Sequence, residues 1–116
     1  MDNSHDEYIG KRLLIGITFV DADDVVLEQF QTHGIITSIN DRDGVTIEQA
    51  NGAGIFYLPP DVENLHEAAA GEYRLRATGE IVVDPDYLTT WTVETAKSEE
   101  IPNYTASGFG PFSRNN

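Results

Sequence analysis

The chain has 116 residues, with 20 Asp and Glu side chains against 7 Lys and Arg, and its formal net charge is -13. This length fits one small domain. Such an acidic chain repels nucleic-acid phosphates and anionic lipid headgroups, and no window approaches the roughly 20 apolar residues of a membrane-spanning helix. We therefore expect no direct nucleic-acid binding and no membrane insertion.

The chain contains no cysteine, which excludes disulfides, thiolate nucleophiles and iron–sulfur clusters. Its first residues are acidic and polar, without the positive and apolar regions of a secretory signal. We therefore expect a cytoplasmic protein whose stability comes from an ordinary hydrophobic core.

The clearest strand pattern covers residues 13–20, where Leu13, Ile15, Ile17 and Phe19 alternate with less apolar positions. Alternation with a period of two is typical of a strand with one buried face. The segment is predicted to be the first strand.

A second β-prone segment, 25–32, has Leu27 and Phe30 on opposite parities. Apolar residues out of phase indicate a bulge or bend, which small barrels need where a strand turns a corner. Gly34 permits a kink before a further strand over residues 35–40.

Two hairpins are expected next. The sequence Asp-Arg-Asp-Gly at 41–44 favours a tight turn into a strand over 45–49, and the Gly-rich turn at 51–54 leads into a strand over 55–58. The two prolines that follow, 59–60, cannot donate to a ladder and end that strand.

Asp61 is a suitable N-cap and Gly71 a suitable C-terminal residue for one short helix over 62–70. The remaining strands are expected over residues 73–77, 81–83 and 87–94.

Short strands that recur with tight turns are typical of small all-β folds. We predict a small, strongly bent antiparallel β-barrel, Src-homology-3-like or Sm-like, with one short helix. Residues 1–8 are expected to form a polar tail, 9–96 the barrel domain and 97–116 a disordered tail. Within that last tail, Phe109 and Phe112 form either a docking element or merely solvated side chains.

Acid–base chemistry at neutral pH would involve a histidine, and His33 is the best placed of the three. It precedes Gly34 at the expected bend, where the alternative role is a hydrogen bond to a backbone carbonyl. The chain offers no serine in a nucleophile elbow and no complete phosphate-binding loop. We therefore predict a non-enzymatic protein without catalytic residues or cofactors.

The acidic turns have two interpretations. Asp21, Asp23 and Asp24, or Asp41 and Asp43, could offer oxygen ligands to a divalent ion. However, these are also ordinary turn residues, and neither turn completes the twelve-residue calcium pattern. No metal site is predicted.

Arg74 and Arg76 share one face of an expected strand in a chain with few positive side chains. One interpretation is an ionic network with neighbouring carboxylates. The other is a site for a small anion or a partner carboxylate, with Tyr57, Tyr73 or Trp91 as a stacking wall and His33 as a further candidate residue. Trp91 also alternates in phase with Val93, as a core residue would.

The first 70 residues carry 13 acidic and 3 basic side chains, so most of the net charge belongs to this part of the chain. Asp21, Asp23, Asp24 and Glu28 form the candidate acidic patch for a basic partner. The charge also keeps a β-rich surface soluble and hinders pairing between strand edges, so it is not specific for a partner.

Several segments, taken together, resemble a family of small uncharacterised bacterial proteins. The resemblance covers roughly residues 8–95 and rests on Gly10-Lys11-Arg12, the 31–34 bend, Leu58-Pro59-Pro60-Asp61, and segments 71–80 and 85–92. It implies a bacterial source and a domain of unknown function, and it assigns no activity or catalytic residue.

Two functions remain open. The first is a protein-interaction module with a basic partner, for example an immunity or inhibitor protein for a toxin or nuclease. The second is a small β-barrel that binds an anionic ligand or a metal. The sequence leaves the oligomeric state undetermined.

Overall fold

We analysed a computed structural model of the chain. The structure describes residues 6–40, 44–50, 52, 54–75, 79–94, 101 and 108. In chain order, its elements are η1 (Asp6–Tyr8), β1 (Arg12–Val20), β2 (Val26–Asn40), β3 (Gly44–Gln49), β4 (Ile55–Leu58), η2 (Val62–Asn64), β5 (His66–Glu67), β6 (Glu72–Arg74), β7 (Ile81–Val83) and β8 (Tyr87–Glu94). None of the helices in this part of the chain is long and apolar enough to cross a membrane.

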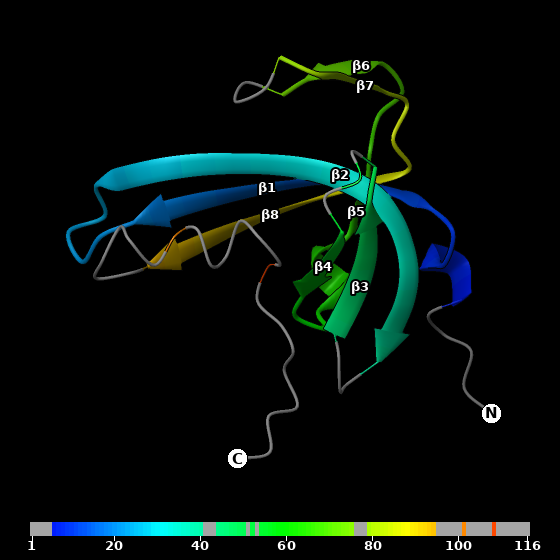
Figure 1. Cartoon of the computed structure of the whole chain (residues 1–116), viewed down its shortest axis with the longest axis horizontal. Helices are drawn as coiled ribbons and strands as arrows, with labels where there is room; N and C mark the ends of the chain where they lie inside the picture. Colours follow the sequence, from blue (N-terminus) through cyan, green and yellow to red (C-terminus); the bar gives the residue numbers. More distant parts are fainter. Residues whose placement is uncertain are drawn as a thin grey trace.

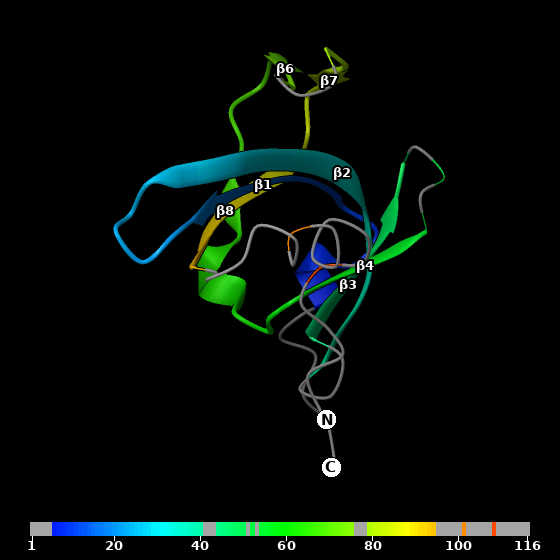
Figure 2. The same ribbon diagram turned by 60° about the vertical axis from the view of Figure 1, so that its left-hand side comes forward.

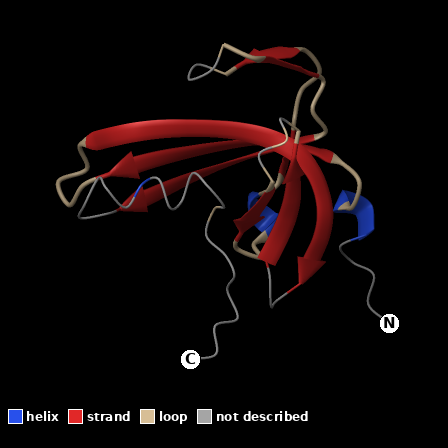
Figure 3. Cartoon of the chain, viewed as in Figure 1, coloured by secondary structure: helices blue, strands red, loops and turns tan. Residues whose placement is uncertain are grey.

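The fold is mostly β, as the sequence predicted. Six strands form one mixed sheet in the order β4-β3-β2-β1-β8-β5, and β6 and β7 form a separate hairpin. The long strand β2 bends strongly, so its first part lies beside β1 and its second part beside β3 (Figure 1). Figure 3 shows the same arrangement with all strands in one colour.

The prediction of a purely antiparallel sheet was wrong, because β1 and β8 are parallel. The chain returns to the start of β1 before β8 begins, and both backbone groups of Arg12 meet Asp86 there. The Arg12 amide donates to Asp86 Oδ2 at 2.9 Å, and the Asp86 amide donates to the Arg12 carbonyl at 3.1 Å. This clamp starts β8 beside the beginning of β1, and the two strands therefore run in the same direction.

The predicted helix over 62–70 was also wrong. Only the three residues of η2 are helical, and Asp61 makes no side-chain cap. The chain then pairs with β8 through His66 and Glu67. Pairing with β8 uses the same backbone donors and acceptors that a helix would need, and these residues form the sheet pairing in place of the helix.

The irregularity predicted for the second strand is confirmed. Phe19 pairs with Glu28 but Val20 pairs with Val26, so Leu27 is an extra residue in β2. Gly34 serves a different purpose from the expected kink, since β2 is continuous there. A Cβ at Gly34 would lie 2.2 Å from the Glu48 carbonyl oxygen, so glycine is required by the close approach of β3.

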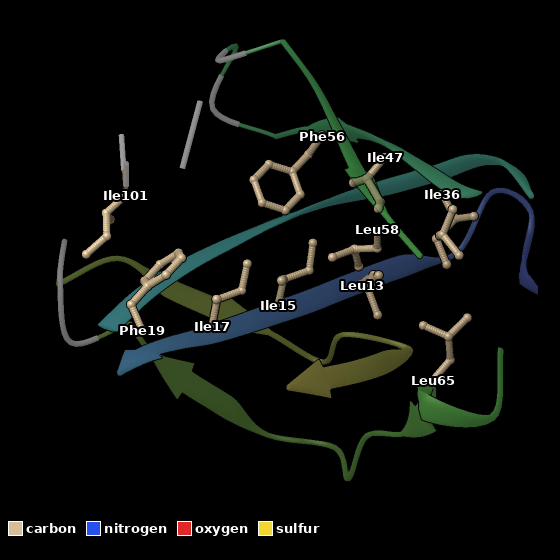
Figure 4. Close-up of a cluster of buried hydrophobic side chains, with 11 residues drawn as sticks. Leu13, Ile15, Ile17, Phe19, Ile36, Ile47, Phe56, Leu58, Leu65 and Ile101 are labelled. Atoms are coloured by element: carbon tan, nitrogen blue, oxygen red, sulfur yellow. The ribbon is translucent and has the colours of Figure 1, made fainter. Parts of the chain in front are cut away.

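The core lies between the β1 layer and the strands beyond the bend. Leu13, Ile15, Ile17 and Phe19 form a row along β1 that is at most 1% exposed. Figure 4 shows this row facing side chains of the bent part of the sheet, namely Ile36, Ile47, Phe56 and Leu58. Each fully buried side chain of this size contributes about 1.5–3 kcal/mol through the hydrophobic effect.

Parts of both predicted tails belong to the folded domain. Tyr8, in η1, packs its ring against Tyr87 with 5.1 Å between centroids. Ile101 is buried in the core cluster near Phe19 (Figure 4), and Gly108 forms a bridge with Tyr57. The predicted turn at 41–43 and the two tail phenylalanines, Phe109 and Phe112, lie outside the described residues.

Candidate functional site: the outer face and hairpin end of the sheet

The sheet has a second face, opposite the core, and the β6–β7 hairpin lies over part of it. Both views place the hairpin beyond the layer of β1, β2 and β8 (Figures 1 and 2). The hairpin is anchored by Leu75 and Val82, which are 1% and 5% exposed although neither belongs to the main core cluster. The chain thus carries a second, smaller apolar contact on its outer face.

His33 joins the hairpin to the sheet. Its Nε2 lies 2.7 Å from Glu80 Oε2, on the segment that leads into β7. The sequence suggested a backbone carbonyl as the structural partner of this histidine. The structure pairs the imidazole with the Glu80 carboxylate, which lies 47 positions further along the sequence.

A cavity of about 250 Å³ lies between the hairpin and the sheet, with His33 and Arg12 in its lining and Ile35, Ile81 and Val83 as apolar walls. A guanidinium and an imidazole beside apolar walls offer hydrogen-bond donors that suit an anion in principle. However, the Arg12 guanidinium donates to the Asp84 carbonyl at 2.6 Å, and His33 contacts Glu80. Both groups therefore already have acceptors within the chain.

The other residues of the predicted anion site lie in different parts of the fold. Arg74 is exposed in β6, and Arg76 falls outside the described residues. Tyr57 lies in the edge strand β4, whereas Trp91 lies in β8, with three strands between them, and packs against the core cluster. The structure gathers His33 with Arg12 and Glu80 instead, a grouping that the sequence did not indicate.

Carboxylates beside Lys11 surround a second cavity, of about 330 Å³, at the start of β1 and β8. Glu67, Asp84 and Asp86 line it together with Tyr87. Burial raises the pKa of Tyr87, and the nearby charges of Glu7, Glu67 and Asp86 raise it further. Across the described residues, no group of three or more His, Asp or Glu side chains is arranged to hold a metal ion.

The candidate acidic patch lies at the turn between β1 and β2. Asp21 has a structural role there, because its Oδ1 accepts hydrogen bonds from the amides of Asp23 and Val25 at 2.8 and 3.0 Å. Asp23, Asp24 and Glu28 are exposed. The patch therefore consists of two exposed carboxylates on the turn and one in β2, while Asp21 holds the turn in shape.

Apolar side chains interrupt this patch, a feature that the sequence analysis missed. Val25, Val26 and Leu27 are 56%, 54% and 37% exposed. The signal in the sequence was a run of three apolar residues between Asp24 and Glu28 without strand alternation. We call Asp23–Glu28, at the turn between β1 and β2, the hairpin end, and this segment is separate from the β6–β7 hairpin.

Beyond the hairpin end, no strand in the described part of the chain pairs with β2 on the side away from β1 before Gly34, and we call this side of β2 at Gln29 the open edge. β2 pairs with β1 from Val26 onward, but it pairs with β3 only from Gly34 onward. The His33 carbonyl accepts from the Ala50 amide on the β3 side. Since alternate residues of a strand direct their backbone groups to the same side, those of Gln29 also face away from β1.

The comparisons with known proteins give no further assignment. No family model, curated protein or solved structure matches this chain.

Proposed function

We propose that the chain is a non-enzymatic protein-interaction module that binds a basic protein partner through the hairpin end and the open edge of β2. An inhibitor or immunity protein for a basic toxin or nuclease is one such module. The observation that carries the proposal is the exposure of Val25 and Val26 by more than half beside outward carboxylates. Apolar side chains rimmed by charge are typical of protein-binding surfaces.

The charge of the chain favours a basic partner. Asp23, Asp24 and Glu28 are exposed at the hairpin end, and Glu94 pairs with Val20 at the adjoining end of β8. The whole chain carries a net charge of -13, so its field attracts a basic protein over a distance of about one Debye length, roughly 8 Å at physiological salt. Such attraction speeds encounter and selects against acidic partners.

The open edge supplies a mode of binding. A strand that ends its pairing on one side presents backbone donors and acceptors to another extended segment. The amide and carbonyl of Gln29 face this side, and the apolar residues of the hairpin end adjoin it. A basic segment with alternating apolar side chains would pair with the edge and place its charges near the carboxylates.

We also propose that the bent sheet is related to the Src-homology-3-like and Sm-like barrels. The bend of β2, which joins two parts of the sheet around one core, supports this relationship (Figure 2).

Fluorescence anisotropy with a labelled peptide of alternating lysine and valine tests the proposal. The triple variant Asp23→Asn, Asp24→Asn, Glu28→Gln is expected to weaken binding about tenfold, because three exposed charge pairs contribute roughly 0.5 kcal/mol each. A control with the same net charge, Glu48→Gln, Glu63→Gln, Glu72→Gln, changes exposed carboxylates elsewhere. Equal weakening by both variants, or no binding by the natural chain, would contradict the proposal.

A further inference from the structure

A trough of about 490 Å³ lies on the outer face of the sheet, over β1, β2 and β8. Ile17 and Phe30 contribute to its lining while their side chains belong to the core side. The remaining lining residues are Gly16, Thr18, Gln29, Gln31 and Thr90. Its volume falls within the range of small-molecule sites, roughly 300–1,000 Å³.

The middle of the trough is open because residue 16 is a glycine. A Cβ built there would meet only Thr90 Cγ2, at 3.8 Å, which is an ordinary contact. The fold therefore does not need glycine at this position, in contrast to Gly34, where a Cβ would meet backbone. A glycine in the interior of a strand costs stability and often marks the close approach of a ligand.

Among the described residues, the side chains that line the trough around Gly16 are uncharged. Gln29 carries a carboxamide, and Thr18 and Thr90 carry hydroxyls, so each of these three side chains both donates and accepts hydrogen bonds. The threonine methyl groups add small apolar surfaces between them. A lining of this kind suits a ligand that offers many hydroxyl groups and C–H surfaces but no charge.

The net charge of the chain and the lining of the trough limit the class of ligand that the trough can bind. The acidic chain disfavours anions, and a cation would gain more at the exposed carboxylates of the hairpin end than at an uncharged lining. We propose that the trough binds an uncharged carbohydrate of the size of a mono- or disaccharide. This site uses side chains on the face of the sheet, whereas the proposed protein partner uses the hairpin end and the backbone edge of β2.

The test is a titration of the ¹⁵N-labelled full chain with glucose, maltose and N-acetylglucosamine, each to about 100 mM, followed by NMR. Binding in the millimolar range is expected for at least one sugar, with shifts at the amides of Gly16, Thr18 and Thr90 and at the Gln29 side chain. The absence of shifts with all three sugars would overturn the proposal, and so would shifts confined to other surfaces.

Two variants separate the trough from the rest of the chain. Gly16→Val fills the space above the strand and is expected to abolish the shifts without lowering Tm, since β-branched residues favour strands. Gly16→Ala serves where the larger side chain prevents folding, with binding weakened several-fold. Glu28→Gln, on the neighbouring position of β2 but directed to the other face, should leave the sugar titration unchanged. Binding that survives both Gly16 variants would contradict the assignment.

Discussion

His33 Nε2 and Glu80 Oε2 lie 2.7 Å apart, and this contact ties the bent strand β2 to the hairpin of β6 and β7. The two side chains are 18% and 40% exposed, so solvent weakens the interaction. A partly exposed pair of this kind contributes about 0–1 kcal/mol. Its effect is therefore local: it holds the hairpin in place more than it stabilises the domain.

Glu80→Ala is expected to loosen the hairpin selectively. Amide hydrogen exchange at Leu75 and Val82 should rise several-fold, while the free energy of unfolding falls by no more than about 1 kcal/mol. Glu72→Ala, which removes an exposed carboxylate from the same hairpin, is the control and should leave the exchange unchanged. Unchanged exchange in Glu80→Ala would show that the apolar contacts of the hairpin suffice.

One substitution type is expected to act in opposite directions at two buried threonines. Thr89 is 1% exposed, and its Oγ1 has no hydrogen-bond partner among the described residues, so Thr89→Val should stabilise the fold by about 1 kcal/mol or more. Thr32, 3% exposed, donates to Gln49 Oε1 at 2.8 Å, so Thr32→Val should destabilise it by about 1–3 kcal/mol. Urea unfolding measures both, and equal signs would contradict this account.

Gly34→Ala is expected to destabilise the fold by about 1–3 kcal/mol, because the new Cβ would lie 2.2 Å from the Glu48 carbonyl oxygen and 2.8 Å from Gln49 Cα. Backbone on both sides leaves little room for adjustment. Gly16→Ala, with only an ordinary contact to Thr90, should stabilise by roughly 0.5–1 kcal/mol. Denaturant unfolding of the two variants gives the comparison, and a neutral Gly34→Ala would show that β3 can shift.

The paired rings of Tyr8 and Tyr87 should make the fold sensitive to alkali. Burial raises the pKa of both phenols above 10.0, and the charge of Glu7 raises it further. The folded state then holds these protons more tightly than the unfolded state. The free energy of unfolding is therefore unaffected below about pH 10 and falls as the pH rises through the shifted values.

Ultraviolet titration of tyrosine ionisation and unfolding at pH 9 and pH 11 measure this effect. The double variant Tyr8→Phe, Tyr87→Phe should lose less stability between the two pH values than the natural chain. If both proteins lose the same amount, the two phenols do not account for the alkaline sensitivity.

Much of the fold could be predicted because its strands follow local rules. The alternation of Leu13, Ile15, Ile17 and Phe19 marks β1 and its buried face, and the phase change between Leu27 and Phe30 marks the bulge in β2. These patterns depend on neighbours along the chain. They therefore survive in the sequence as a period of two and its interruption.

What the sequence did not show depends on contacts between distant segments. The parallel pairing of β8 depends on the clamp between Arg12 and Asp86, 74 positions apart, and the expected helix gave way to pairing of His66 with Leu88. The local propensity of a segment does not depend on such distant partners, so it could not indicate them. The candidate site was hidden for the same reason, since His33 meets Glu80 through the folded hairpin.

The open edge of β2 carries the central claim that the chain binds a basic segment by strand addition. The most direct measurement is an NMR titration of Gln29→Pro and Gln29→Ser with the alternating lysine–valine peptide. Proline at position 29 removes the backbone N–H donor that faces away from β1, and edge strands tolerate proline at such a position. Serine keeps this donor. We predict that the natural chain and Gln29→Ser show salt-sensitive shifts at Leu27, Glu28 and residue 29, and that Gln29→Pro, still folded, loses them. Equal binding by the proline and serine variants would contradict the claim.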